Sequence, residues 1–258
     1  MQKLIVGNLK MNILTISERE KYFESFKKEI KKKKLTNSQI VFCPPSVHIE
    51  SFVKKIKSKI VSIGAQDIFW EDKGSYTGEI SAPMIKNLGA EYVILGHSDR
   101  RRYFFENDEK INLKISAAIR SGLKIILCIG ENGEQKKSGN GEATVSEQLE
   151  GCLKNISPTK IANVSVCYEP VWAISSNNPD HLPTTDEIMS AKLLIKKFLV
   201  GKYGIKIAGK LKIIYGGSVD SNSVKETCID SGMDGALVGK ESLTLSNFIK
   251  IVEIIDKD

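Results

Sequence analysis

Three ionisable side chains stand at the ends of short apolar runs, where their types could carry out proton transfer. Glu169 closes one such run, His97 follows another, and Lys10 follows a third. Burying a charge is costly, so a carboxylate at the end of an apolar run calls for an explanation. One explanation is that it serves as a general base. An imidazole exchanges protons near neutral pH, and a lysine supplies fixed positive charge to an oxyanion. Each residue alone also has a plainer interpretation: a salt-bridged carboxylate, a structural histidine and a solvated lysine.

Two glycine turns follow later apolar runs. They read Tyr215-Gly216-Gly217-Ser218-Val219 and Val238-Gly239-Lys240-Glu241-Ser242. Glycines at such points let backbone N–H groups approach a phosphate, with a helix N-terminus behind it. One glycine turn alone is a weak signal. Together with the carboxylate, the imidazole and the lysine, the two turns indicate a site for a phosphorylated ligand, since none of the plainer interpretations places all these groups at the ends of apolar runs.

Short apolar runs alternate with helical stretches along the chain, and these elements must position the reactive side chains. The runs predict strands at Leu4–Asn8, Gln39–Cys43, Ile60–Ala65, Tyr92–Leu95, Lys124–Cys128, Val164–Glu169, Leu211–Tyr215 and Gly235–Val238. They are continuous rather than alternating, which is typical of parallel strands covered on both faces. Predicted helices include Ile16–Lys33 with Ser17 as N-cap, Thr184–Leu199 and Thr244–Ile255.

About eight strand–helix units are therefore expected in a single α/β domain spanning residues 1–258. That count suits a closed barrel, and a doubly wound open sheet of the same units is the competing architecture. Periodicity alone does not separate the two. In both, functional residues lie beyond the carboxyl ends of the strands.

Composition narrows the class of protein. The chain has 258 residues, 41% of them hydrophobic. It contains no charge-free stretch long enough to span a bilayer, and its N-terminal apolar run is too short for a secretory signal. We therefore expect a cytoplasmic protein with no membrane segment.

Charge and cysteine usage narrow the expected partners further. The net charge of +7 suits either nucleic acid or an anionic substrate. Its densest run, Lys27–Lys34, has no interleaved aromatic residues and is typical of a solvated helix face, so no nucleic-acid partner is expected. The five cysteines are odd in number and form no CxxC pair, which favours buried thiols over disulfides or metal ligands.

In combination and in order, the motifs of this chain resemble the triosephosphate isomerase family from end to end. The matching segments are Gly7–Asn12, Gly64–Asp67, Gly74–Glu79, Ser81–Pro83, Gly96–Ser98, Leu127–Glu131, Tyr168–Trp172, Tyr215–Val219 and Asp234–Gly239. The resemblance implies a (β/α)₈ TIM barrel, a closed parallel eight-stranded sheet with helices outside. It also implies an aldose–ketose isomerase that interconverts D-glyceraldehyde 3-phosphate and dihydroxyacetone phosphate in glycolysis and gluconeogenesis.

The resemblance assigns a role to each reactive side chain. Glu169 removes a proton from the carbon beside the substrate carbonyl and returns it to the neighbouring carbon. His97, as neutral imidazole, polarises the carbonyl and moves protons between the enediolate oxygens. Lys10 supplies positive charge to the intermediate, and Asn8 helps to position substrate and lysine. The glutamate base, the neutral histidine and the closing loop are well-known features of this family.

The remaining expectations also come from the resemblance. The phosphate is held by backbone N–H groups around Ser175, Ser218, Gly239 and Lys240, and the loop after Trp172 closes over it as a lid. Asp99 and Tyr215 support these residues from behind. No cofactor or metal is required. The segment 66–79 resembles the family's dimer loop, so we expect a homodimer in which this loop reaches the partner beside its Asn8 and Lys10.

Four departures from the family pattern bear on function. Asp99 stands where the family has Glu and is shorter by roughly 1.5 Å, so either turnover is reduced or a water or backbone shift compensates. The lid, Ala173–Pro183, lacks two usual glycines and is longer by about three residues. Lys240 replaces a glycine; its ammonium either attracts phosphate or points to solvent, and we favour solvent. Leu9 and Phe105 are expected to be packing variations.

Two alternatives remain at this point. The altered lid could admit a longer substrate, which would make the protein an isomerase of a four-carbon ketose phosphate. Alternatively, the barrel could be catalytically weakened and retained for binding phosphosugars or partners. Against the second, Lys10, His97 and Glu169 are all present.

Overall fold

Eight short strands pair in parallel in the order in which they occur along the chain. The computed structural model describes residues 2–30, 33–174 and 181–258. The strands are β1 (Lys3–Asn8), β2 (Ser38–Cys43), β3 (Val61–Ala65), β4 (Tyr92–Leu95), β5 (Lys124–Ile129), β6 (Val164–Tyr168), β7 (Ile213–Tyr215) and β8 (Gly235–Val238). Each strand pairs with the next, and β8 pairs with β1 to close a barrel. The closed barrel is confirmed, and the open-sheet alternative is excluded.

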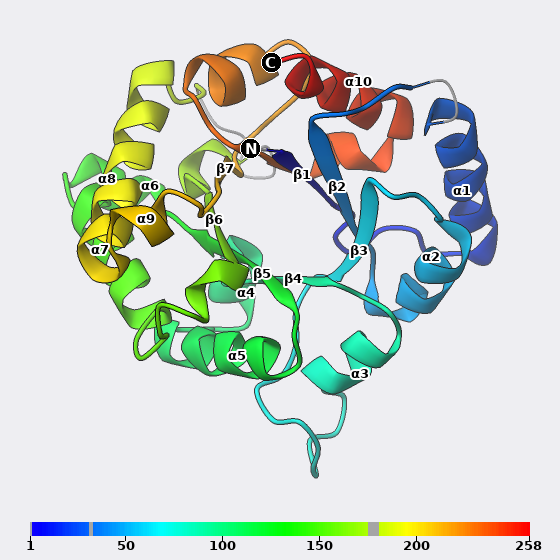
Figure 1. Ribbon diagram of the computed structural model, residues 1–258, viewed down its shortest axis with the longest axis horizontal. Helices are drawn as coiled ribbons and strands as arrows, with labels where there is room; N and C mark the ends of the chain where they lie inside the picture. Colours follow the sequence, from blue (N-terminus) through cyan, green and yellow to red (C-terminus); the bar gives the residue numbers. More distant parts are fainter. Residues whose placement is uncertain (1, 31–32, 175–180) are drawn as a thin grey trace.

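Helices connect the strands and form an outer ring around the barrel (Figure 1). The α-helices of the described residues are α1 (Ile16–Ile30), α2 (Ile49–Lys55), α3 (Ala82–Asn87), α4 (Ser98–Tyr103), α5 (Asp108–Arg120), α6 (Gly133–Lys137), α7 (Gly141–Cys152), α8 (Thr185–Tyr203), α9 (Ile205–Ala208) and α10 (Leu245–Asp256), and a π-helix, Lys225–Asp230, lies between β7 and β8. Among the residues that the structure describes, no helix is long and apolar enough to cross a membrane.

The apolar residues of the strands divide between two buried clusters, except that those of β3 all belong to the second. One cluster contains strand residues alone and therefore fills the barrel interior; it includes Leu4, Val6 and Ile214. The other joins strand residues such as Ile5 to the inner faces of the helices. Because both faces of every strand are buried, the strands read as continuous apolar runs in the sequence.

The first helix begins at a different cap from the one predicted. Thr15 Oγ1 accepts a hydrogen bond from the Glu18 N–H at 3.1 Å, and the Glu18 carboxylate accepts one from the Thr15 N–H at 3.0 Å. This reciprocal pair is a capping box, so Ser17 lies inside the first turn and the prediction of Ser17 as N-cap was wrong. The helix ends at Ile30 among the described residues, short of the predicted Lys33.

Other boundaries moved by a few residues. Thr184 is the N-cap of α8, again in a capping box with Glu187, and the helix continues to Tyr203 rather than ending at Leu199. Strand β6 ends at Tyr168, which leaves Glu169 just beyond the strand. The ends of a helix or strand depend on a few local contacts and can differ from the prediction by several residues. The type of each element depends on its whole apolar pattern and was predicted correctly.

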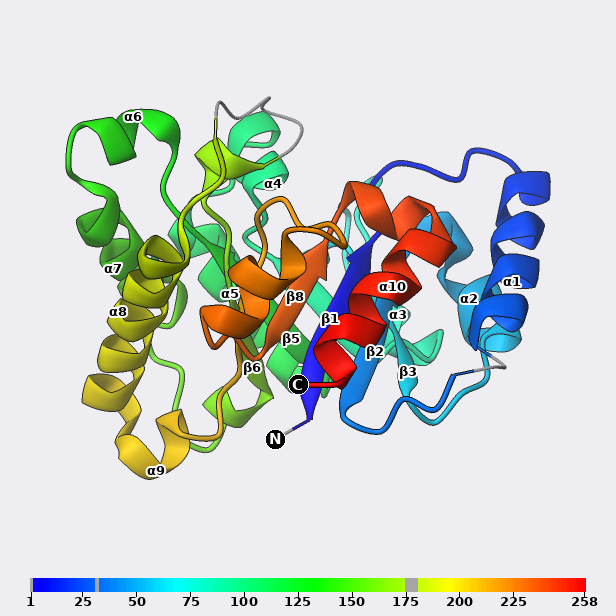
Figure 2. The same ribbon diagram turned by 90° about the horizontal axis from the view of Figure 1, so that it is seen from above.

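Parallel strands in a closed barrel place all their carboxyl ends at one end of the molecule. Figure 2 shows this end at the top, with α4 and α6, and both chain termini lie toward the opposite end. Lys10, His97 and Glu169 each follow a strand directly or within two residues. The barrel therefore gathers on one rim side chains that are more than 150 positions apart at the extremes of the sequence.

We predict that Thr15→Ala lowers the free energy of unfolding by about 1 kcal/mol, because the variant loses the side-chain half of the capping box. Ser17→Ala is the matched control, and its effect should stay within about 0.5 kcal/mol, since this exposed serine caps nothing. Urea unfolding at one fixed protein concentration measures both. Equal effects of the two substitutions would contradict the assignment of Thr15 as the cap.

Candidate active site

One cavity of about 420 Å³ opens at the carboxyl ends of the strands. Among the described residues, its lining includes seven that the sequence singled out: Asn8, Lys10, His97, Glu169, Ser218, Gly239 and Lys240. Asn8 is the last residue of β1, and the others come from the segments that follow β1, β4, β6, β7 and β8. The barrel thus brings the expected base, imidazole, lysine and glycine turns to a single cavity, while their individual roles remain predictions.

Glu169 and His97 are in direct contact in the floor of this cavity. His97 Nε2 lies 3.1 Å from Glu169 Oε1. The other carboxylate oxygen, Oε2, accepts a hydrogen bond from the Ser98 N–H at 3.0 Å. Glu169 is 2% exposed and His97 5%. A carboxylate this deeply buried needs such donors, because an unpaired buried charge is strongly unfavourable.

The turn after β4 sets the orientation of the imidazole. Gly96 has φ of +74°, a conformation that glycine adopts without strain, and it turns the chain directly before His97. His97 is the N-cap of α4, and its Nδ1 accepts a hydrogen bond from the Asp99 N–H at 3.1 Å. Because Nδ1 is the acceptor, the ring proton is assigned to Nε2, the atom that faces Glu169.

Lys10 is held in an unusual backbone conformation. Its φ is +49°, which is uncommon for a residue other than glycine. The Lys10 N–H donates to Asn8 Oδ1 at 3.1 Å, and Gln66 Nε2 donates to the Lys10 carbonyl at 2.8 Å. Side chains on both sides of the residue therefore fix the strained conformation, a pattern that is frequent at functional sites.

Asp99 reaches Lys10 despite its short side chain. Lys10 Nζ lies 3.0 Å from Asp99 Oδ2. The ion pair is therefore direct, and the compensation by an intervening water considered for the shorter residue is not needed. Asp99 does not line the cavity among the described residues, and its supporting role stays a prediction.

The phosphate-binding set expected from the sequence is only partly described. Ser175 lies outside the described residues. The Ser218 N–H and hydroxyl both donate to the Ala173 carbonyl, at 3.2 and 2.8 Å. Gly239 is the N-cap of a one-turn 3₁₀ helix, Lys240–Leu243, and the first N–H groups of such a turn lack partners within it. The geometry suits anion binding at Gly239 and Lys240, whereas Ser218 must first release Ala173.

Tyr215 lies behind the first glycine turn and not in the cavity lining. Its side chain is fully buried. A Cβ on Gly217 would come within 2.2 Å of the Tyr215 hydroxyl, so the turn packs against the ring only because residue 217 is glycine. Burial raises the pKa of Tyr215 well above its usual value, so this phenol stays neutral.

Sequence reasoning missed the role of Glu131. Its buried carboxylate accepts hydrogen bonds from the Tyr168 hydroxyl at 3.0 Å and from Trp172 Nε1 at 2.7 Å. These contacts hold the chain on both sides of Glu169 to the segment that follows β5. The signal was available, because Glu131 follows an apolar strand just as Glu169 does.

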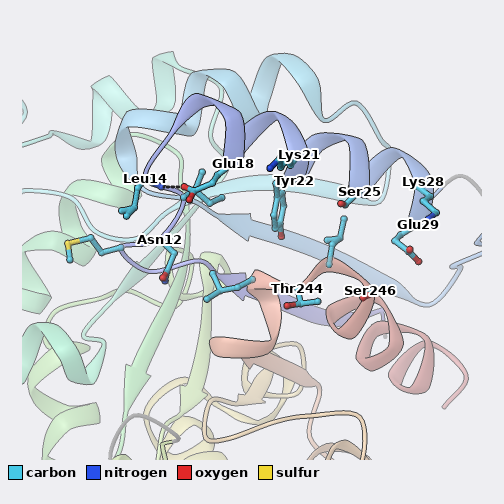
Figure 3. Close-up of a pocket in the computed structure, with 14 residues that line it drawn as sticks. Asn12, Leu14, Glu18, Lys21, Tyr22, Ser25, Lys28, Glu29, Thr244 and Ser246 are labelled. Carbon is cyan, nitrogen blue, oxygen red and sulfur yellow. Dashed lines mark hydrogen bonds between the residues drawn. The ribbon is translucent and has the colours of Figure 1, made fainter.

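A larger cavity of about 630 Å³ lies between α1 and the start of α10 (Figure 3). Its described lining contains no histidine or cysteine. Glu18 is engaged in the capping box, and the Tyr22 hydroxyl donates to the Ser242 carbonyl at 3.0 Å. Nothing in this lining resembles an acid–base pair, so we assign the chemistry to the smaller cavity. In the described chain, no three histidine, cysteine, aspartate or glutamate side chains cluster as metal ligands would.

Known proteins resemble this chain over almost its full length. A family model described as Triosephosphate isomerase matches residues 3–255. The triosephosphate isomerase of Thermoanaerobacter pseudethanolicus is 40% identical over 249 residues, which cover 96% of this chain and 98% of that protein. Those of Alkaliphilus oremlandii and Dictyoglomus turgidum are each 37% identical, over 96% and 97% of this chain and 98% of theirs.

Proposed function

The chain belongs to the triosephosphate isomerase family, and we propose that it interconverts D-glyceraldehyde 3-phosphate and dihydroxyacetone phosphate with Glu169 as the base. The match confirms the resemblance inferred from the motifs. The observation that carries the proposal is the buried contact between Glu169 and His97, in a cavity that also holds Lys10. Relatives with this activity in their names cover nearly the whole chain, so the four-carbon substrate and the binding-only barrel are not favoured.

The proposed reaction starts with proton removal by Glu169. The carboxylate takes a proton from the carbon beside the substrate carbonyl, and an enediolate forms. Substrate oxygens compete for the His97 Nε2–H, which in the structure faces the carboxylate at 3.1 Å. When an oxygen takes over that donor, the carboxylate is released from the imidazole and is free to attack the carbon-bound proton. Return of the proton to the neighbouring carbon completes the isomerisation.

The other residues stabilise the charge that develops on the enediolate oxygens. His97 donates from Nε2 and passes protons between the two oxygens. Lys10 contributes a fixed positive charge, and its position is set by Asp99, Asn8 and Gln66. Donors that are in place before the reaction need no reorganisation during it, which is the usual source of such stabilisation.

We also propose a single-domain homodimer joined through the segment 66–79. Figure 1 draws this segment as a loop that projects from the barrel between β3 and α3. Its root is fixed by the pair Lys114–Asp67 at 2.7 Å, and Phe69 packs against Tyr76 within it. The cytoplasmic location predicted from the sequence stays a prediction.

Exposed apolar side chains support the same assembly. Met11 is 87% exposed and directly follows Lys10, and Val47 is 80% exposed after β2. Phe104, at the end of α4, is also largely exposed. All three follow strands at the carboxyl end of the barrel, and large apolar side chains left exposed at one end of a protein are typical of a surface that becomes buried on association.

We predict a kcat/KM for glyceraldehyde 3-phosphate of roughly 10⁷–10⁸ M⁻¹s⁻¹, with no deficit from Asp99, because the ion pair to Lys10 is made directly. Glu169→Gln removes the base while keeping the hydrogen-bonding shape, and should lower kcat at least about 10³-fold. A coupled spectrophotometric assay measures both. Negligible turnover in folded, unsubstituted protein that still binds phosphosugars would contradict the proposal and favour the binding-only barrel.

For the assembly, we predict a dimer at micromolar concentration in analytical ultracentrifugation. Thr77→Arg places a long charged side chain near the tip of the loop and should weaken dimerisation at least about tenfold, because the guanidinium would have to be buried. Thr159→Arg, in an exposed loop on another part of the surface, is the control and should leave the dimer unchanged. A monomeric unsubstituted protein would contradict this assembly.

A further inference from the structure

The cavity that is proposed to receive a phosphorylated substrate has more acidic than cationic side chains in its described lining. Among the described lining residues, the acidic side chains are Glu169, Asp220 and Glu241, and the cationic ones are Lys10 and Lys240. A phosphate monoester carries close to two negative charges at neutral pH. With three acids against two lysines, the charged side chains of this lining do not together favour a dianion, so the placement of each lysine matters.

The two acids that do not take part in the chemistry are fixed in place. Asp220 Oδ1 accepts hydrogen bonds from the Ser223 and Asn222 N–H groups, each at 2.8 Å. The bond from Ser223, with that from Asn222, holds the pKa of Asp220 below its usual range, so this carboxylate stays charged. Glu241 Oε2 accepts from Asn247 Nδ2 at 2.8 Å. Neither carboxylate is neutralised by a cation through a contact among the described residues.

Lys10 does not offset these acids. Its ammonium is already paired with Asp99 at 3.0 Å, and it belongs to the reacting end of the cavity. Lys240, by contrast, is exposed and forms no ion pair with any residue of the described ranges 2–30, 33–174 and 181–258. It follows Gly239, where an added Cβ would lie 3.7 Å from Lys10 Cε. Lys240 therefore stands on the same rim as Lys10, with its charge uncommitted.

We infer that the Lys240 ammonium, and not only its backbone N–H, captures the substrate phosphate and sets the affinity of this cavity for it. This inference rests on the proposed isomerase function and reverses the expectation that the side chain points to solvent. A flexible lysine at the mouth attracts the dianion before it docks, and then neutralises it beside Asp220 and Glu241. Such attraction accelerates association and weakens as salt screens it.

The test compares Lys240→Met, which keeps the apolar stem but removes the charge, with Lys240→Arg, which keeps the charge. Lys250→Met, on the exposed side of α10, is the control for the same change in net charge. We expect Lys240→Met to lower kcat/KM about three- to tenfold at low ionic strength, through KM, with kcat within about twofold. The deficit should shrink to less than about twofold at 0.5 M salt. Lys240→Arg and Lys250→Met should stay near the unsubstituted protein.

Binding of inorganic phosphate, measured by calorimetry, gives a readout that does not depend on turnover. Lys240→Met should weaken phosphate binding by a similar factor, and Lys240→Arg should restore it. Unchanged KM and unchanged phosphate affinity in Lys240→Met would overturn the inference, as would a loss confined to kcat and insensitive to salt. If the unsubstituted protein binds phosphate but does not isomerise, the proposed function fails, and the phosphate measurements alone decide the role of Lys240.

Discussion

A buried carboxylate has to be held by hydrogen-bond donors, and in this protein both donors to Glu169 come from the turn after β4. His97 Nε2 and the Ser98 N–H face its two oxygens. The two segments meet only because β4, β5 and β6 are neighbours in a closed barrel with a fixed register. The register of the strands therefore determines the geometry of the acid–base pair. Without those donors the carboxylate would not tolerate a position that is 2% exposed.

Hydrogen bonds and an ion pair also fix the residues around Glu169. The backbone of α4 directs the Asp99 N–H to His97 Nδ1, which leaves the other ring nitrogen to face Glu169. The side chain of Asp99 pairs with Lys10, so one residue links the imidazole and the lysine. Lys10 in turn keeps a strained backbone conformation because Asn8 and Gln66 hold it from both sides. The ion pair of Lys10, the tautomer of His97 and the strained backbone of Lys10 are therefore all fixed by contacts between the segments that follow strands β1 to β6.

Much of this arrangement could be predicted from the sequence. Lys10, His97 and Glu169 were recognisable because each follows a run that is apolar on both faces. Closure of the barrel was predicted only through the family resemblance, since it depends on β8 pairing with β1 across the whole chain, and local periodicity carries no record of that contact. Thr15 and Ser17 are both good caps, and the choice between them depends on the reach of Glu18. The acidic surroundings of Lys240 could not be predicted from the sequence either, because Asp220 comes from a different loop that only the fold brings to the same cavity.

The tautomer of His97 tests the account most directly, because the proposed donor to substrate is its Nε2–H. The chain has three histidines, so ¹⁵N-detected NMR of the imidazoles, with His97→Gln to assign the signal, resolves the residue of interest. The account predicts a proton on Nε2 and an unprotonated Nδ1 that accepts the Asp99 N–H. A proton on Nδ1 in the folded protein would contradict it, because Nε2 would then face the Glu169 carboxylate without a proton to donate.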